Sequence, residues 1–414
     1  MQRRQAYKFR LQPDGRQKRQ MRRFAGSCRF VYNKALALQR ERYAHREKKF
    51  SYVDLCKLLT GWRHSQETSW LADSPIHPLQ QKLKDLDRAY VNFFAKRSSF
   101  PCFKKKGRND SFRYPAPKEI KLDQDNARVF LPKLGWLRYR KSREILGDVK
   151  NVTVSQAGGK FFASIQTERE VPDPVHPASS LVGVDLGVAN FAALSTGERI
   201  VPVNALKRHT RRLAHHQRAL SRKRKFSSNW KKEKSNISKI HARIGNIRHD
   251  YLHKLSTSLS QNHAGIVIED LQVSNMSKSA AGTVDHPGNH VRAKSGLNRS
   301  ILDQGWSEFR RQLEYKQTWR GGIVVAVDPR NTSRTCPACG CVDKANRPTQ
   351  SRFECVGCGH QANADVNAAV NILAAGHAVI ACGGGVRPLS HQPAVVAAPV
   401  KQEPTEATSC SELH

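Results

Sequence analysis

The chain has 414 residues, a formal net charge of +37 at pH 7 and a sequence pI near 10.3. This length predicts two to four domains, and a hydrophobic fraction of 38% is too high for a wholly disordered basic protein. The charge excludes an ordinary metabolic enzyme as the default, because so much positive charge repels itself unless a polyanion neutralises it. Nucleic acid is the obvious polyanion.

Both strands and helices are predicted in the first 180 residues. Residues 5–12 alternate polar and apolar side chains up to Pro13, which predicts one short strand. Residues 15–100 have helical spacing, and 16 Lys or Arg among the first 50 residues predict a basic helical face. Residues 101–170 contain short strand patterns between turns and indicate a small β-barrel or sheet that the first strand can join. The proline-rich residues 171–180 are predicted to be a linker.

The second half alternates buried strands and helices. Strands are predicted at 181–188, 264–271 and 322–327, and helices at 205–256, through Trp306 to Tyr315, and at about 363–375. The segment 205–256 has 16 Lys or Arg against two acidic residues, so we expect it to contact phosphates; a merely solvated face is the alternative. Residues 274–298 are predicted to be a polar loop, and residues 376–414 a disordered tail.

Two pairs of cysteines have the spacing of a metal site. Cys336 and Cys339 form one Cys-x-x-Cys turn, Cys355 and Cys358 form another, and 15 residues separate the pairs. Four thiolates on two tight turns predict a closed tetrahedral site for structural Zn²⁺. Free thiols or a redox pair would not explain two evenly built turns. We expect the nearby Cys341 not to bind the metal, and a closed site leaves catalysis to other residues.

Three carboxylates interrupt otherwise apolar segments. Asp185 lies within the first strand of the second half, Glu269 near the end of the next, and Asp365 on the last helix among Ala and Ile residues. A buried charge is costly unless it is paired or bound to metal. Two divalent cations about 3.5–4 Å apart would explain all three, and oxygen ligands favour Mg²⁺ or Mn²⁺. Such a pair of cations cleaves phosphodiesters.

Each carboxylate also has a simpler explanation when it is taken alone. It could cap a neighbouring element, face solvent or interact with a helix dipole. Asp270, Asp328 and Asp250 are competing candidates, although Asp270 must point to the opposite face of the strand from Glu269. The occurrence of all three carboxylates in one strongly basic chain is what favours a shared metal centre.

The order of several motifs resembles the TnpB (OrfB) family of proteins encoded by insertion sequences, which are ancestral to the type V CRISPR effectors. The motifs are Ser27-Cys-Arg-Phe-Val-Tyr-Asn, Val184-Asp-Leu-Gly, Ile268-Glu-Asp-Leu, Ile301-Leu-Asp-Gln-Gly-Trp, Asn331-Thr-Ser-Arg-Thr-Cys-Pro-Ala-Cys-Gly, Cys355-Val-Gly-Cys-Gly and Asn363-Ala-Asp-Val-Asn-Ala-Ala-Val-Asn-Ile. The resemblance covers about residues 1–375, and the ordered combination is far more specific than any one motif.

The resemblance implies a mixed α/β multidomain protein. Residues 181–375 would be a RuvC-like nuclease domain with an RNase H-like fold, carrying the basic segment 205–256, a lid at 274–298 and an inserted zinc ribbon at 332–360. Residues 1–14 and 101–170 would form a wedge-like β-barrel, with a helical recognition insert at 15–100. Asp185, Glu269 and Asp365 match the three carboxylates of the family and would bind Mg²⁺.

The implied activity is RNA-guided cleavage of double-stranded DNA beside a short adjacent motif. The guide RNA would come from the end of the transposon, and a transposase encoded by the same element is a further expected partner. With no apolar run of about 18 residues and no secretory signal, we expect no membrane span and a cytoplasmic, nucleoid-associated location in a bacterium or archaeon. A strand-joining transposase and a non-catalytic nucleic-acid-binding regulator are the alternatives.

Overall fold

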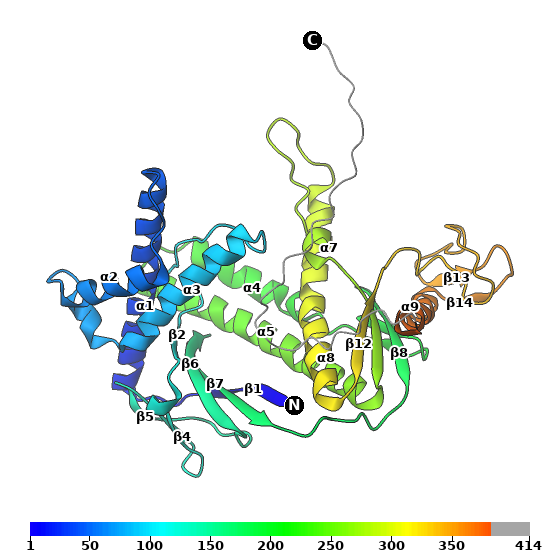
Figure 1. Cartoon of the computed structure of the whole chain (residues 1–414). Helices are drawn as coiled ribbons and strands as arrows, with labels where there is room; N and C mark the ends of the chain where they lie inside the picture. The colour runs from blue at the N-terminus through cyan, green and yellow to red at the C-terminus, as the bar shows by residue number, and fades with distance from the viewer. Residues whose placement is uncertain (382–414) are drawn as a thin grey trace, which may run out of the picture.

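Residues 1–170 form a first lobe in which helices pack on antiparallel strands (Figure 1). The computed structural model describes residues 1–381. The alternation predicted for the first strand is confirmed, because Tyr7, Phe9 and Leu11 are buried on one side of it. The elements of this lobe are β1 (Gln2–Arg10), α1 (Gly15–Ala44), α2 (Tyr52–His64), α3 (Ile76–Phe94), β2 (Ser111–Tyr114), β3 (Lys121–Asp123), β4 (Arg128–Leu131), β5 (Gly135–Arg138), β6 (Asp148–Ala157) and β7 (Lys160–Glu170).

The strands of this lobe make two sheets. One has the order β1-β7-β6-β2 and the other β3-β4-β5, and all neighbours are antiparallel. An isolated bridge between Leu11 and Tyr139 joins them. In the part of the chain that the structure describes, the strands do not close into the predicted barrel. Strands β3, β4 and β5 have only three or four residues each, which is too short to continue the larger sheet around to its other edge.

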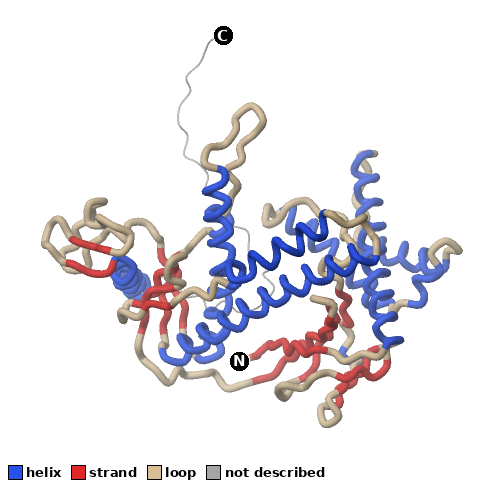
Figure 2. Tube along the Cα trace, turned by 180° about the vertical axis from the view of Figure 1, so that it is seen from behind, coloured by secondary structure: helices blue, strands red, loops and turns tan. Residues whose placement is uncertain are grey.

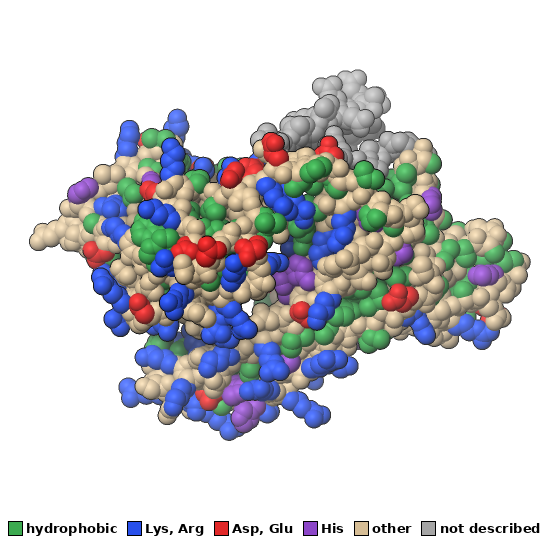
Figure 3. Space-filling model, turned by 90° about the horizontal axis from the view of Figure 1, so that it is seen from below, with side chains coloured by type: hydrophobic (Ala, Val, Ile, Leu, Met, Phe, Trp, Pro, Cys, Tyr) green, Lys and Arg blue, Asp and Glu red, His purple; other side chains and the backbone are tan. Residues whose placement is uncertain are grey.

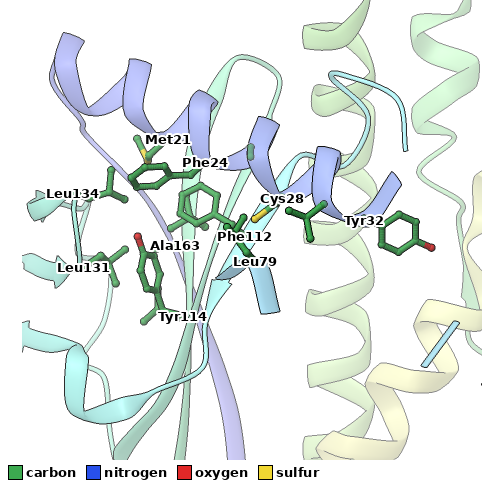
Figure 4. Packing of buried hydrophobic residues seen from close by; sticks show 14 of the residues in the cluster. Met21, Phe24, Cys28, Tyr32, Leu79, Phe112, Tyr114, Leu131, Leu134 and Ala163 are labelled. Carbon is green, nitrogen blue, oxygen red and sulfur yellow. The ribbon is translucent and has the colours of Figure 1, made fainter. Parts of the chain in front are cut away.

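Helix α1 is fixed to the larger sheet by a continuous apolar core. Met21, Phe24 and Cys28 recur at helical spacing and meet Phe112 and Tyr114 of β2 (Figure 4). The ring of Phe24 stands edge-on to Phe112, with 5.9 Å between their centroids. An Asp14–Gln17 capping box starts the helix. Because the apolar residues of α1 are buried on one side, most of its basic side chains lie on the exposed side.

The second lobe is built around a five-stranded sheet of order β10-β9-β8-β11-β12. Strands β8, β11 and β12 are parallel, and β9 and β10 are added to β8 in an antiparallel arrangement. Helix α9 covers one face of the sheet, while α5 and α8 lie over the other (Figure 1). The elements are β8 (Leu181–Leu186), β9 (Ala192–Leu194), β10 (Arg199–Ile200), α4 (Ala205–Ser221), α5 (Ser228–Asn262), β11 (Gly265–Glu269), α6 (Val273–Met276), α7 (Val291–Gln304), α8 (Trp306–Arg320), β12 (Ile323–Val327), β13 (Arg352–Glu354), β14 (Gln361–Asn363) and α9 (Ala364–Ala381).

Two glycines allow α9 to lie directly on the sheet. A Cβ on Gly183 of β8 would stand 2.1 Å from the carbonyl oxygen of Ala369, and one on Gly376 would stand 2.4 Å from a methyl carbon of Val267. By length and composition α9 could cross a membrane, and it is the one helix among residues 1–381 that could. Its buried Ala368, Ala369 and Ile372 instead make it the core helix of this sheet.

Two segments predicted from the sequence have different limits in the structure: the C-terminal tail and the loop 274–298. Helix α9 continues to Ala381, because Gly376 still packs on β11, so residues 376–381 are not part of a disordered tail. The remainder of that predicted tail, 382–414, lies outside the described residues. The predicted loop 274–298 contains α6 at its start and the first turns of α7 at its end, where Gly296 sits in open space and does not interrupt the helix.

The basic segment 205–256 forms a hairpin of α4 and α5 that reaches from the second lobe toward the helices of the first (Figure 2). The buried carboxylate of Asp303 accepts hydrogen bonds from the backbone N–H of Leu206 and from the guanidinium of Arg248. This carboxylate ties both helices of the hairpin to α7. The lobes are also joined by the linker 171–180 and by Arg3, whose guanidinium lies 4.1 Å above the ring of Trp319.

Candidate functional site

The sheet of the second lobe brings two of the three predicted carboxylates together. Strands β8 and β11 are parallel, with Ile268 beside Val184, so Asp185 and Glu269 follow side by side at the carboxyl ends. Asp365 lies in the first turn of α9, which packs across β8 and β11. Ligands commonly bind beyond the carboxyl ends of parallel strands. Residues 180 positions apart in the sequence therefore meet at one edge of the sheet.

The electrostatics of Asp185 show that the three groups share one environment. Burial, together with the negative charges of Glu269 and Asp365, raises the pKa of Asp185 to about 7, while the positive charge of Arg347 opposes this rise. Burial also raises the pKa of Glu269, against a hydrogen bond from Thr332. Neighbouring carboxylates with raised pKa values are typical of sites that bind cations or transfer protons.

Three further side chains contact the carboxylates. The Thr332 hydroxyl donates to Glu269 Oε1 at 2.9 Å, and the Asn190 amide donates to Asp365 Oδ2 at 3.0 Å. Arg347 Nη2 lies 3.3 Å from Asp365 Oδ1 and also donates to a backbone carbonyl at Gln350. No motif or periodicity in the sequence pointed to Asn190 or Arg347. Thr332 lies within a quoted motif, but only the fold shows that it reaches Glu269.

The competing acidic residues are each neutralised by a cation. Asp270 pairs with Arg310, Asp328 with Arg330, and Asp250 with Lys254. Within residues 1–381, Asp185 and Glu269 form no such ion pair. A hollow of about 350 Å³ borders Glu269 and is lined in part by Leu271, Trp306 and Ser307. The absence of an ion pair at Asp185 and Glu269 among the described residues, and the hollow beside Glu269, are compatible with binding of a cation at this edge of the sheet.

The four cysteines form a compact cluster between β12 and α9. The Sγ atoms of Cys336, Cys339, Cys355 and Cys358 all lie within 4.8 Å of one another, with 3.6 Å from Cys336 to Cys358 and 3.5 Å from Cys339 to Cys355. In the part of the chain that the structure describes, no other group of three or more His, Cys, Asp or Glu side chains has its ligand atoms within 4.8 Å of one another. The three carboxylates do not meet this distance. The cluster does not include Cys341, and its donor set is that of a structural zinc site.

The two cysteine turns have the same backbone geometry. The N–H of Gly340 donates to the carbonyl of Cys336, and the N–H of Gly359 donates to that of Cys355, each at 2.9 Å. The two glycines have φ values of 75° and 74°, a left-handed conformation that glycine adopts without strain. The fully buried Asn346 donates to the carbonyl of Cys341 and accepts from the N–H of Val356, which connects the two turns. Sequence analysis did not identify Asn346.

Positive charge covers much of the surface. Figure 3 shows Lys and Arg side chains spread over the left and lower parts of the face seen from below. On the hairpin, buried Leu213, Ile240 and Ile244 join α4 to α5, so most of their basic side chains remain outside. An exposed basic surface of this kind suits contact with a phosphate backbone.

Three family models match separate parts of the chain. A model described as "Probable transposase" (OrfB of IS605) matches residues 164–280, a Cas12f1-like TNB domain matches 306–372, and a helix-turn-helix domain matches 1–48. In the structure, the last of these segments consists chiefly of β1 and the long helix α1. The second matched region begins at α8 and includes the four-cysteine cluster and the start of α9.

Full-length relatives also match. The "Putative RNA-guided DNA endonuclease InsQ" of Escherichia coli (strain K12) is 60% identical over 98% of this chain and 98% of its own length. The "Putative RNA-guided DNA endonuclease" of Streptomyces pristinaespiralis is 36% identical over 98% of this chain and 97% of its own length. A Cas12f1 chain solved with its guide RNA and target DNA is 15% identical with a TM-score of 0.49, over 86% of this chain and 81% of that one. The chain belongs to the OrfB (TnpB) family that its ordered motifs predict.

Proposed function

We propose that this protein is a transposon-encoded, RNA-guided DNA endonuclease that cuts DNA beside a short adjacent motif. The observation that carries the proposal is the convergence of Asp185, Glu269 and Asp365, whose mutual repulsion helps raise the pKa of Asp185. The names of the full-length relatives support the same activity. The strongly basic chain supports guide RNA and double-stranded target DNA as its partners.

We further infer that the second lobe is a RuvC-like nuclease domain with an RNase H-like fold. Three antiparallel strands followed by two parallel ones, with helices on both faces, support this assignment. The domain would span 181–375, with the zinc ribbon inserted at 332–360. The sheets of 1–14 and 101–170 would act as the wedge, 15–100 as the recognition insert, 171–180 as the linker, and 274–298 as a lid.

The carboxylate centre fits Mg²⁺ or Mn²⁺, because it gathers one buried and two half-buried carboxylates with one partly exposed arginine as counter-ion. Divalent cations held by Asp185, Glu269 and Asp365 would supply the Lewis acid for phosphodiester hydrolysis. Thr332 and Asn190 orient two of the carboxylates. Arg347 pairs with Asp365 and is placed to meet the negative charge of a phosphate at the same edge.

The four thiols would hold Zn²⁺ in a closed site, with no open position for chemistry. The ribbon nevertheless contributes to the carboxylate centre, because Thr332 precedes the first cysteine turn and Arg347 lies between the two turns. We infer that the zinc ion acts on catalysis by keeping these two side chains in position.

The test uses protein co-expressed with its native downstream transposon DNA. The purified complex is incubated in Mg²⁺ with a plasmid library that carries a guide-matched target beside randomised bases, and an Asp185→Ala complex is treated in parallel. Cleavage by the wild type alone, confined to matched targets, is the expected result and would reveal the adjacent motif. Cleavage that ignores the guide would contradict RNA guidance.

The same experiment separates the alternatives. A transposase is favoured by the description of the model that matches 164–280, and it would give strand-joined products in place of cut ends. A regulator would bind nucleic acid tightly with no cleavage by either protein. Co-purification with a transposase from the same element would test that further partner, and co-fractionation with nucleoid DNA would test the location.

A further inference from the structure

We propose that His249 and His253 form a second transition-metal site, on the face of α5 that lies near α8 and β1. The two residues are four positions apart on one helix, so their side chains project from the same face one turn apart. Their Nε2 atoms are 3.1 Å apart, and their ring centroids are 4.2 Å apart. This site is separate from the carboxylate and cysteine centres and does not depend on the proposed nuclease activity.

The separation of the two nitrogens is the one that a shared metal ion requires. Imidazole nitrogen binds Zn²⁺ at about 2.0–2.1 Å, and two such bonds about 100° apart place the nitrogens roughly 3.1 Å from each other. That angle lies between the octahedral and the tetrahedral value. A single N–H···N hydrogen bond would give a similar distance, so binding of metal must decide between the two explanations.

The site is preorganised and reachable. Lys316 Nζ donates to the backbone carbonyl of His253 at 2.8 Å and to the hydroxyls of Ser256 and Thr257, which fixes this turn of α5 against α8. His249 is exposed and His253 is half-buried, so an ion and its waters have access. Burial and neighbouring positive charges lower the pKa of both imidazoles, that of His253 to about 4, which favours the neutral form that binds metal.

The surrounding charges select the kind of metal. Glu308 of α8 is the nearby anion, but it is engaged by Arg311 and Gln312. Lys8 of β1 and Arg311 and Lys316 of α8 are the nearby cations. This positive environment opposes any cation, so only an ion that binds imidazole nitrogen strongly can overcome it, and a hard ion such as Mg²⁺ does not. Cu²⁺, Ni²⁺ and Zn²⁺ bind imidazole more strongly and are the ions expected at this site.

The test is a calorimetric titration of the full chain with Ni²⁺, with the four-cysteine cluster first loaded with zinc. Zinc release is monitored, so that exchange at the cysteines is not counted as new binding. We expect one equivalent of Ni²⁺ to bind the wild type, and at least about tenfold weaker binding in His249→Gln and in His253→Gln. His241→Gln is the matched control, since His241 is exposed on the same helix and has no histidine one turn away.

A spectroscopic measurement keeps the test independent of folding. With one equivalent of Cu²⁺, the electron paramagnetic resonance spectrum of the wild type should show coupling to two equivalent nitrogens, and that of His249→Gln should not. Circular dichroism of each variant checks that α5 is intact. Wild-type affinity for Ni²⁺ retained in the folded His249→Gln variant would overturn the proposal. So would a wild type that binds no Ni²⁺, because the pair would then be only hydrogen-bonded.

Discussion

The four thiols and the three carboxylates are both sets of candidate metal ligands, but they are assembled in opposite ways. The thiols come from 23 consecutive residues, Cys336–Cys358, and two matching turns bring them within 4.8 Å of one another. The carboxylates come from two strands and a helix spread over 181 residues, Asp185–Asp365. Local backbone geometry builds the first centre, and the topology of a sheet builds the second.

The difference teaches how each centre depends on the rest of the protein. The cysteine cluster is closed and locally complete, whereas the carboxylates repel one another and raise the pKa of Asp185. Yet the centres are not independent. Thr332 and Arg347 of the ribbon contact Glu269 and Asp365. The four predictions that follow test this dependence, from the largest expected effect to the smallest.

Loss of one thiol should disable both centres. In Cys355→Ser we expect loss of bound zinc, unfolding of the ribbon and loss of cleavage, because structural zinc contributes on the order of 10 kcal/mol in zinc-finger peptides. Zinc content by mass spectrometry and cleavage of a matched plasmid are the measurements. Cys341→Ser is the control, since that thiol lies outside the cluster. Full cleavage by a zinc-free Cys355→Ser protein would show that the centres are independent.

Arg347→Ala should impair the carboxylate centre and leave the cysteine cluster intact. Zinc content should stay unchanged, while cleavage falls about 10- to 100-fold because a positive charge is lost beside the carboxylates and the phosphate. Arg352→Ala is the matched control, because Arg352 belongs to the same ribbon but pairs with Glu354. Equal cleavage rates for the two variants would remove Arg347 from the centre.

Asp185→Asn should stabilise the metal-free protein at pH 8. The pKa of Asp185 is raised to about 7 in the folded state, so between about pH 4 and pH 7 the folded state binds more protons than the unfolded state. The free energy of unfolding of the wild type therefore falls as pH rises through this range. Asp185→Asn should therefore raise the free energy of unfolding by on the order of 1–3 kcal/mol at pH 8 relative to the wild type, with little effect at pH 4.

Thermal unfolding in chelator at both pH values measures the effect. Adding Mn²⁺ should then stabilise the wild type more than Asp185→Asn, because only the wild type keeps all three carboxylates. A variant no more stable than the wild type at pH 8 would show that Asp185 is not under repulsion.

Thr332→Val should have the smallest effect. It removes the hydroxyl that donates to buried Glu269, so the pKa of that carboxyl should rise further and the metal-free protein should lose about 1 kcal/mol at neutral pH. Urea unfolding in chelator measures it, and cleavage should fall only a few-fold. Thr335→Val is the control, since its hydroxyl donates to the backbone carbonyl of Asn331. Indistinguishable unfolding midpoints would deny Thr332 a role.

The sequence predicted the parts of these centres that have local signals. Cysteine spacing is read directly from the chain, and the apolar surroundings of Asp185 and Glu269 identified them as unusual. The first strand, the helical character of the basic segment 205–256 and the strands of the second lobe also follow from local periodicity, but the break that turns this segment into a hairpin of α4 and α5 was not predicted. Arg347 and Asn190 have no such signal, because only the packing of the ribbon and of α9 onto the sheet brings them to Asp365.

The errors also have physical causes. Composition suggested that the ordered part of the chain ends near residue 375. Helix α9 instead continues to Ala381, because Gly376 permits close contact with Val267. The short strands were compatible with a barrel or a sheet, and the family resemblance implied a barrel; in the described chain they form two sheets, which one isolated bridge at Leu11 joins without closing a barrel. Periodicity identifies a strand but does not say how the edges of a sheet will be paired.

The place of α9 at the end of the described chain sets an order of assembly during synthesis. The sheet of the first lobe is complete once β7 has left the ribosome, because β7 pairs with β1. The second sheet lacks the cover on one face until α9 emerges, and α9 also brings Asp365. Domains generally fold as units in the order of their synthesis. A growing chain can therefore present its basic first lobe well before it has a complete set of carboxylates.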